Sequence, residues 1–581
     1  MATHQLADVE REGNRLRRFV PFLSWIRSYD RRWLSADIVA GLTLWGLVVP
    51  EALAYAGVAG LPPQMGLYTL LAGLLVYALL GTSRHLVVQG TSATAALIAS
   101  SVTAVMIATG AAADAGSIDP TLYQQYAIAF VLVVGGVFLI AGAARLGFIT
   151  QFLSKPVMSG FVTGLAIFVA VGQLNKLFGV PKGQGNTVQK LTAIIRELPD
   201  ANWITFAIGA SALALLFVIP RLSKKLPAGL IVLFGYIALS TVLALNATYD
   251  VDVVGALPQG LPSVGLPAVG FDALLAMVAP AIGVLLVAFS EALGVGHEFA
   301  EKHGYEVDAN QELNAHAVAN LVSGLFGGMI AAGSMSASAV KEAAGARSQV
   351  TNLVTWLATI VTVLFLTPLF KSLPEAVLGA LIIHAVWHII ASRKLRRIRL
   401  ESRTEFWLGV LTFAGVLFVD VLEGMLLGLI CSLVVFIYKS SRPHLSRLGR
   451  VPGVSGAWSD LGRHPENTAV PEVLILRLDG PLYYANALTV AEQVKQMVAE
   501  TQPRPKAVLF DAAAQDELDI TSAEVLTSLF KGLRDQGIAI YLADVHAPVW
   551  AFAVKMGLDK LVSEAQIYPS VEAAVQAITG E

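Results

Sequence analysis

Long apolar runs, separated by short polar stretches, fill most of the first 440 residues of the chain. A helix needs about 20 apolar residues to cross a bilayer, and fewer where it is broken or surrounded by protein. By this measure the pattern predicts an all-α membrane domain of fourteen transmembrane segments. The second, third, ninth and tenth segments are short or rich in Gly, Ser and Thr, and alone they would insert poorly. The predicted segments lie near residues 36–56, 66–81, 92–109, 123–144, 150–175, 203–220, 227–246, 272–296, 309–328, 335–346, 349–370, 375–391, 405–420 and 422–440.

The pattern changes near residue 472, where shorter apolar stretches alternate between strand and helix periods. Strands are expected at 473–478, 507–511 and 538–543, and helices at 521–535 and 548–557. Such alternation predicts an α/β domain with a parallel sheet. The chain then divides into a cytoplasmic N-terminal segment at 1–34, a transmembrane domain at 35–440, a proline-containing linker at 441–471, and an α/β domain at 472–581.

Composition supports a membrane protein and excludes several other classes. Of 581 residues, 55% are apolar and 14% are charged, whereas a soluble chain carries about 25% charged residues. The net charge of −2 provides no basic surface for nucleic acid. Cys431 is the single cysteine, and His384 and His388 have no third ligand beside them, so we expect no disulfide framework and no metal site. No P-loop, HExxH or GxSxG motif stands out, so we expect neither an enzyme nor a bound cofactor.

Basic residues orient the predicted segments. With the N-terminus inside, the predicted outside loops at 57–65, 110–122 and 247–271 contain no Lys or Arg. The predicted inside loops contain Arg84, Arg145, Arg221, Lys224, Lys225, Arg347, Arg393, Lys394, Arg396, Arg397, Arg399 and Arg403. This positive-inside pattern places both termini in the cytoplasm and the domain in the plasma (inner) membrane. Only the loop at 176–202, with four basic residues, contradicts it.

Two similar stretches indicate an internal repeat. Val88-Gln89-Gly90-Thr91-Ser92-Ala93-Thr94-Ala95 resembles Ala331-Ala332-Gly333-Ser334-Met335-Ser336-Ala337-Ser338, and Gly333 follows Gly90 by 243 positions. The carboxylates Glu51 and Glu291 are separated by a similar 240 positions. Seven segments per half is an odd number, so the second half would enter the membrane inverted. We therefore predict a seven-plus-seven inverted repeat.

Inverted-repeat transporters bind substrate near the membrane midplane, between broken helices whose N-termini face an anionic group. A helix N-terminus offers unpaired N–H donors and about half a positive charge. The alternative is that these small residues only permit tight helix packing. The match of two stretches, each opening a short segment, favours an anion site. Its predicted members are Gly90, Thr91, Ser92, Ala93, Gly333, Ser334, Met335, Ser336 and Ala337, with Tyr55 as a pore-lining or packing residue.

Glu51 and Glu291 are carboxylates well inside predicted membrane segments. Glu51 follows Pro50 in the first segment, and Glu291 lies well inside the eighth. A carboxylate at that depth is costly unless it is paired, protonated or facing water, which makes both residues candidates for proton coupling. For Glu51 the alternative is that it accepts N–H groups freed by Pro50. For Glu291 the alternative is a buried structural pair.

The motifs together resemble the sulfate-permease (SulP) family, also called solute carrier family 26. The resemblance covers essentially the whole chain. It rests on Val49-Pro50-Glu51-Ala52-Leu53-Ala54-Tyr55-Ala56, Ala59-Gly60-Leu61-Pro62-Pro63 and Gly66-Leu67-Tyr68, on Phe289-Ser290-Glu291-Ala292 through Lys302-His303-Gly304-Tyr305-Glu306 and Asn310-Gln311-Glu312, and on Gly333 to Gln349.

The resemblance implies a gate-and-core architecture, an anion held between the third and tenth helix N-termini, and a homodimer that works by an elevator-type movement. The C-terminal region is similar to a STAS domain, which implies a cytoplasmic regulatory protein as a further candidate partner. In related STAS proteins a serine before a helix is phosphorylated. Here Thr521 or Ser522 lies in that loop, and helix capping is the simpler role.

Two positions depart from the family pattern. Ala337 stands where many relatives have arginine, which removes a fixed positive charge unless the helix dipoles suffice or Lys341 compensates. Glu51 stands where many relatives have glutamine, which favours proton coupling over a simple channel. We therefore expect a secondary active transporter of a small oxyanion, most readily sulfate, coupled to protons through Glu291. The alternatives are sodium- or proton-coupled transport of bicarbonate or a C4-dicarboxylate, an anion exchanger, and a channel.

Overall fold

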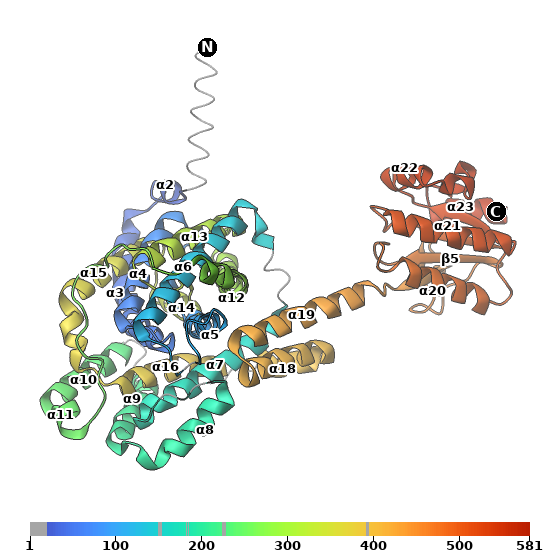
Figure 1. The fold of residues 1–581 in the computed structure, drawn as a ribbon. Helices are drawn as coiled ribbons and strands as arrows, with labels where there is room; N and C mark the ends of the chain where they lie inside the picture. Colours follow the sequence, from blue (N-terminus) through green and yellow to red (C-terminus); the bar gives the residue numbers. More distant parts are fainter. Residues whose placement is uncertain are drawn as a thin grey trace. The chain divides into compact units, whose positions relative to one another are not determined.

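The computed structural model describes residues 20–114, 116–148, 154–181, 183, 185–222, 228–390 and 394–580. The chain forms two compact units, residues 1–432 and 433–581. The first unit is helical and the second contains a six-stranded sheet (Figure 1).

The helical unit contains two sets of elements in the same order. The first set comprises α2 (Phe22–Trp25), η1 (Arg31–Trp33), α3 (Leu34–Val58), α4 (Pro63–Leu80), β1 (Val88–Gln89), α5 (Ser92–Ala108), α6 (Pro120–Ala143), α7 (Lys155–Phe178), α8 (Thr187–Glu197), η3 (Leu198–Asp200), α9 (Trp203–Leu222), α10 (Ala228–Leu243) and α11 (Leu245–Tyr249). The second set comprises α12 (Phe271–His303), α13 (Ala309–Leu325), β2 (Ala332–Gly333), α14 (Met335–Ala343), α15 (Val350–Val361), η4 (Thr362–Leu366), η5 (Thr367–Ser372), α16 (Glu375–Ile390), α17 (Lys394–Glu401), α18 (Arg403–Phe418) and α19 (Val421–Ser440).

Each of the fourteen predicted membrane segments contains a helix in this order. Among the described residues, eight helices are long and apolar enough to cross a membrane, and three shorter apolar helices accompany them. The count of fourteen crossings therefore stays a prediction. The helices α5 and α14 begin at Ser92 and Met335, where the glycine-containing stretches predicted helix starts.

Two helical stretches lie outside the predicted membrane segments: the helix α8 and the last turns of α12. The segment 176–202, whose basic residues opposed the charge rule, contains the amphipathic helix α8, with most of its residues exposed. The helix α12 continues to His303, where Gly304 ends it in a left-handed conformation (φ 67°). His297 and Glu298 are therefore exposed residues within a helix.

Two groups of helices pack within the helical unit. The first group comprises α3, α4, α5, α6, α12, α13, α14 and α15, and the second comprises α7, α9, α10, α16 and α18. Small residues allow the closest approaches, since the Cα of Gly160 on α7 faces the backbone of Gly409 on α18 without room for a side chain. The grouping agrees with the expected division into a core and a gate.

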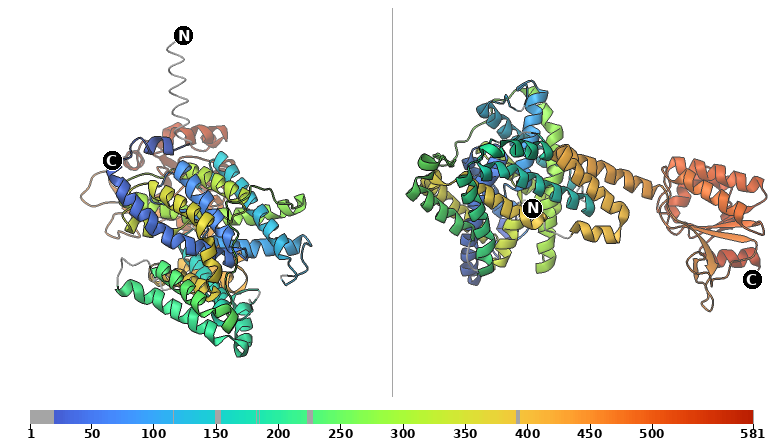
Figure 2. Two further views of the ribbon diagram at one scale, coloured as in Figure 1. Left: turned by 90° about the vertical axis from the view of Figure 1, so that its left-hand side faces the viewer. Right: turned by 90° about the horizontal axis from the view of Figure 1, so that it is seen from below.

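The second unit is built on a mixed sheet with the strand order β4-β3-β5-β6-β7-β8. The strands β5 to β8 run parallel, and β3 and β4 are antiparallel additions. Helices α20, α21 and α22 cover one face, and α23 covers the other (Figure 2). The elements are β3 (Leu445–Arg450), β4 (Trp458–Asp460), β5 (Val473–Leu478), α20 (Ala487–Glu500), β6 (Ala507–Asp511), α21 (Ile520–Asp535), β7 (Ala539–Ala543), α22 (Ala547–Lys555), η6 (Leu558–Lys560), η7 (Glu564–Gln566), β8 (Ile567–Tyr568) and α23 (Val571–Thr579).

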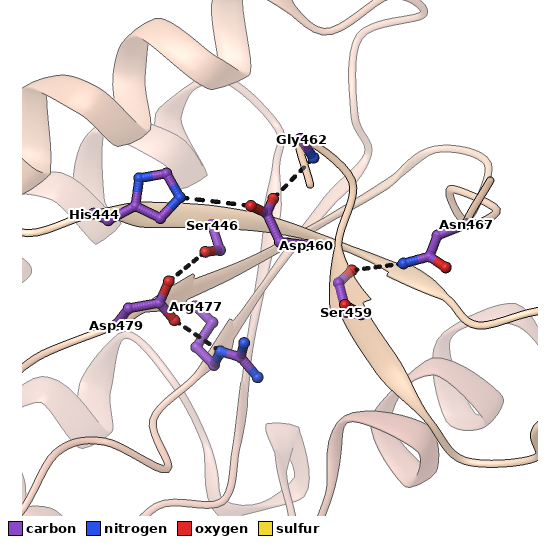
Figure 3. Close-up of polar contacts among 8 residues, drawn as sticks. All are labelled: His444, Ser446, Ser459, Asp460, Gly462, Asn467, Arg477 and Asp479. Atoms are coloured by element: carbon purple, nitrogen blue, oxygen red, sulfur yellow. Dashed lines mark hydrogen bonds and ion pairs between the residues drawn. The ribbon is translucent and has the colours of Figure 1, made fainter. Parts of the chain in front are cut away.

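The strands β3 and β4 lie in the segment 441–471, which the proline content assigned to a linker. Leu445 and Leu448 of β3 are buried in the cores on opposite faces of the sheet, and polar contacts join β3 and β4 to their neighbours (Figure 3). The Ser446 hydroxyl donates to Asp479, whose carboxylate also accepts from Arg477 Nε at 3.0 Å. The linker prediction is therefore corrected for these strands, which complete the sheet.

Candidate functional site

Two short strands bring the repeated glycine stretches together. Val88 pairs with Gly333 and Gln89 pairs with Ala332 in an antiparallel ladder. Each strand leads directly into a helix, β1 into α5 and β2 into α14. Because the strands run in opposite directions, the two helices leave the ladder in opposite directions and their N-termini meet. The structure thus brings together two regions that lie 243 positions apart in the sequence.

Hydroxyl groups cap both helix N-termini. Thr91 and Thr94 form a capping box on α5, in which each side chain accepts from the backbone N–H of the other, at 3.2 and 3.0 Å. On α14 the Ser334 hydroxyl accepts from the N–H of Ala337 at 3.3 Å. In each helix the N–H groups preceding the capped one have no intrahelical acceptor. They remain available to an anion at the crossing.

The two glycines differ in what surrounds them. A Cβ on Gly333 would lie 2.6 Å from Ala292 Cα on α12, so packing alone explains that glycine. A Cβ on Gly90 would meet Met329 Cε at 3.5 Å, an ordinary contact. Protein packing therefore does not demand glycine at position 90. The close approach of a ligand to the backbone at Gly90 stays a prediction.

The predicted site residues divide between covered and open positions. Thr91, Ala93 and Ser334 are buried, and Ser92 is partly exposed. Met335 is 45% exposed and Ser336 is also exposed. The open side of the crossing is therefore the first turn of α14.

Neither Ala337 nor Lys341 provides a positive charge at the crossing. Ala337 is fully buried, in the turn that Ser334 caps. Lys341 is also fully buried, and its Nζ donates to Asn352 Oδ1 on α15 at 2.9 Å. The hypothesis that Lys341 replaces the missing arginine is therefore not supported by its position. The helix N-termini are the positive features of the site.

A hydrogen bond from Gln89 connects Glu51 to the crossing. Gln89 was not among the predicted site residues. Gln89 Nε2 donates to Glu51 Oε2 at 3.0 Å and also lies 3.4 Å from Ser334 Oγ. Ser334 Oγ lies in turn 3.2 Å from Ser336 Oγ. The helix α3 continues through Pro50, so Glu51 does not serve a broken helix. The only signal for Gln89 was its place beside Gly90, since contacts over 38 and 245 positions leave no local pattern.

Glu291 differs from the other enclosed carboxylates of this unit. Asp37 accepts five hydrogen bonds, from Tyr29, Arg347, Ser348 and Thr351. Glu312 accepts four, from Tyr77 and Thr82. The described residues show no hydrogen bond or ion pair to the half-buried Glu291.

The absence of a partner argues against a structural pair at Glu291. The neighbouring Ser290 hydroxyl and the Gln89 Oε1 atom are likewise buried without a described partner. Tyr55 is 5% exposed and lies within electrostatic range of both Glu51 and Glu291. Two carboxylates, a tyrosine and two helix N-termini thus surround one region. Such a region can bind an anion and take up protons.

Asp519 caps the N-terminus of α21 in the second unit, in place of Thr521 or Ser522, for which the sequence predicted this role. Asp519 accepts from Ser522 N at 3.0 Å and from the Ser522 hydroxyl at 2.8 Å. Partial burial acts to raise the pKa of Asp519, but these bonds outweigh it and hold the pKa below its ordinary value. Ser522 is fully buried and Thr521 is exposed. Of the two candidate modification sites, only Thr521 is accessible.

The fold defines a mostly helical membrane protein, in which two strands pair and each leads into a helix, followed by an α/β domain. Residues 34–412 match the sulfate permease family, and residues 464–574 match the STAS domain. The chain belongs to the sulfate permease family.

Relatives cover nearly the whole chain. "Probable sulfate transporter MT1781" of Mycobacterium tuberculosis is 33% identical over 559 residues, which cover 96% of this chain and 98% of that protein. The structure of the murine solute carrier 26 family member A9 anion transporter in the inward-facing state is similar, with a TM-score of 0.88 and 23% identity over 97% of this chain and 94% of that one. The transmembrane domain of a cyanobacterium bicarbonate transporter, BicA, aligns with a TM-score of 0.59 and 22% identity over 70% of this chain and 98% of that domain. The two structural likenesses show the fold.

Proposed function

We propose that this chain is a secondary active transporter that carries sulfate into the cell together with protons. The family assignment supports anion transport, and the relative of M. tuberculosis is described as a probable sulfate transporter. The observation that carries the proposal is the crossing of β1 and β2, which gathers two helix N-termini beside Glu51 and beside Glu291, which has no partner among the described residues.

Charge balance supports coupling to protons. Two helix N-termini supply together roughly one positive charge, which is half of what a sulfate dianion requires. Ionised carboxylates at Glu51 and Glu291 would add repulsion in a region of low dielectric. Protonation of Glu291 removes one such charge. It is favoured because no cation among the described residues pairs with the ionised form. A loaded site carrying a proton is therefore cheaper to move past an apolar gate.

The movement that we propose is of the elevator type. The helices that carry the site form one packed group, and α7, α9, α10, α16 and α18 form another, so the first can move past the second as a body. We also propose that the transporter is a homodimer in the plasma membrane with both termini in the cytoplasm. A cytoplasmic protein that binds the STAS domain would regulate it.

Uptake into proteoliposomes tests the substrate and the coupling ion together. Labelled sulfate, bicarbonate, chloride and fumarate are offered with an inward proton gradient, with an inward Na⁺ gradient, and with neither. We expect sulfate to accumulate against its gradient only when protons drive it. Accumulation of bicarbonate with Na⁺ would replace the proposal, and equilibration without accumulation would indicate a channel.

Two variants test the proposed roles of Glu291 in proton coupling and of Gly90 in sulfate binding. Glu291→Gln should lower proton-driven uptake at least tenfold, whereas Glu298→Gln, an exposed position on the same helix, should leave it unchanged. Gly90→Trp should abolish sulfate binding in protein that still elutes as a folded species. Unchanged proton dependence in the first variant would remove Glu291 from the mechanism. Normal uptake in the Trp variant would place the substrate elsewhere.

A further inference from the structure

A cavity with polar and aromatic lining lies away from the crossing, at the end of the helical unit where α3 begins. Its volume is about 580 Å³, within the range of small-ligand sites. Four segments line it: the region around α2 and η1, the turn after α4, the turn between α12 and α13, and the turn between α14 and α15. Figure 1 shows α2 beside the start of α3. The transport mechanism proposed above does not use this cavity.

Charged groups around the cavity favour an anion. Arg84 and Arg347 line it together with one acidic residue, Glu306. Both arginines are exposed, and among the described residues neither pairs with a carboxylate. Arg84 instead lies 5.4 Å from the centre of the Tyr305 ring. The arginines at 27, 31 and 32 are also exposed and add positive potential beside the cavity.

Two buried polar atoms of the lining lack partners. The indole N–H of Trp25 has no acceptor, and the side-chain oxygen of Gln349 has no donor, among the described residues. Gln349 is 3% exposed, and its amide nitrogen is already used by the carbonyl groups of Ser83 and Leu86. A group that both accepts and donates hydrogen bonds would satisfy both atoms. A phosphate ester bearing free hydroxyl groups has that chemistry.

The surface next to the cavity favours a lipid as the source of that phosphate. On α3, immediately beyond the cavity, Leu34, Ile38, Val39 and Leu42 are exposed apolar residues, between 39% and 60% open. Trp25, Tyr29 and Trp33 line the cavity itself, and such aromatic residues are typical of the interface between membrane and water. Basic pockets on the cytoplasmic side of membrane proteins bind anionic headgroups. A headgroup in the cavity would leave its acyl chains against this apolar strip.

We propose that this cavity binds the headgroup of an anionic phospholipid of the phosphatidylglycerol type. The arginines hold the phosphate, the Trp25 indole donates to it, and a glycerol hydroxyl donates to Gln349. The lipid would also bridge the start of α3 and the turn after α14, which Asp37 already joins through Arg347 and Ser348. Binding would therefore stabilise the half-helix that bears Ser334.

Thermal unfolding of the full-length protein in detergent tests the proposal. Dioctanoyl phosphatidylglycerol, dioctanoyl phosphatidylcholine and inorganic phosphate are added separately, since a ligand of the folded state raises its unfolding temperature. We expect phosphatidylglycerol alone to raise it at low concentration. In the double variant Arg84→Gln with Arg347→Gln, the concentration for half of this shift should rise at least tenfold. Arg221→Gln, a basic position outside the cavity, is the control and should behave as wild type.

Each other outcome would overturn the proposal. An equal shift with phosphate would assign the cavity to a small anion, and an equal shift with phosphatidylcholine would remove headgroup recognition. An unchanged response in the double variant would place the lipid elsewhere. Should the double variant not fold, the single variants Arg84→Gln and Arg347→Gln are compared with Arg84→Lys and Arg347→Lys. A charge-based site predicts that lipid binding weakens in the Gln variants and not in the Lys variants. Weakened lipid binding in both kinds of variant, or in neither, contradicts such a site.

Discussion

The segments β1–α5 and β2–α14 hold equivalent places in the two repeats, yet they differ in length, capping and exposure. The helix α5 has 17 residues and a capping box, whereas α14 has 9 residues and one capping serine. The carboxylate of the first repeat, Glu51, is hydrogen bonded, and that of the second, Glu291, has no described partner. By its cap and its hydrogen-bonded carboxylate, the first repeat supplies the more firmly held wall of the site, although Gly90 itself is open. The second repeat supplies the more exposed wall, although Gly333 itself is packed against α12.

The largest expected effect concerns the two glycines. Gly333→Ala should lower the free energy of unfolding by roughly 1–3 kcal/mol, because its new Cβ would collide with the backbone of Ala292. Gly90→Ala should change it by less than about 1 kcal/mol while weakening sulfate binding. Denaturant or thermal unfolding of the purified variants measures the first quantity, and substrate titration measures the second. Equal losses of stability would mean that packing explains both glycines.

The second effect concerns Gln89. Gln89→Leu should destabilise the protein by about 2 kcal/mol at neutral pH, because Glu51 would lose the Gln89 amide and keep only the Ser336 hydroxyl as a side-chain donor. Glu291→Gln should be nearly neutral for stability, since no described partner is lost. The two variants are compared in the same unfolding experiment. A larger loss for Glu291→Gln would reveal a partner and reverse the comparison.

The third effect is a difference in accessibility. In a Cys431→Ser background, which removes the single native cysteine, Met335→Cys should react with a water-soluble maleimide at least tenfold faster than Ala93→Cys. Met335 is 45% exposed and Ala93 only 4%. Saturating sulfate should slow the reaction at position 335. Similar rates at both positions would show that the two walls are equally open.

The smallest effect concerns the helix caps. Thr91→Ala should cost about 1 kcal/mol of stability and Ser334→Ala about 0.5 kcal/mol, because the Thr91 hydroxyl bonds both the N–H and the hydroxyl of Thr94, whereas Ser334 caps its helix with one bond to Ala337 N. Thermal unfolding resolves the difference when both variants are prepared together. A larger cost at Ser334 would indicate that its contact with Gln89 contributes more than the cap.

The sequence predicted those parts of the fold that depend on local patterns. The small residues before Ser92 and Met335 marked both helix starts, and the buried strands at 473–478 and 507–511 have the predicted bounds. The SulP and STAS resemblance is confirmed by the family matches. The end of α12 was missed because its last turns are polar, and hydropathy does not register a polar helix. The strands β3 and β4 were missed because prolines and glycines surround them and their partner in the sheet follows later in the chain.

The site could be predicted only as far as local signals reach. The sequence indicated which stretches and carboxylates to examine, but it contains no signal for the contact of Gln89 with Glu51. The sequence also could not show that the Lys341 side chain points toward Asn352. Its position one turn after Ala337 does not determine whether the side chain faces the site or α15. The substrate-binding and coupling roles of the named residues stay predictions until the transport experiments are done.

The two-residue ladder between β1 and β2 has a consequence for the origin of the molecule. Each repeat contributes one strand and one helix N-terminus, so neither repeat alone contains a complete crossing. An ancestor consisting of a single repeat would have had to pair with a second, oppositely inserted copy of itself to form the same ladder. After duplication and fusion, the two copies no longer needed to remain identical. The unequal walls of the present site record that freedom.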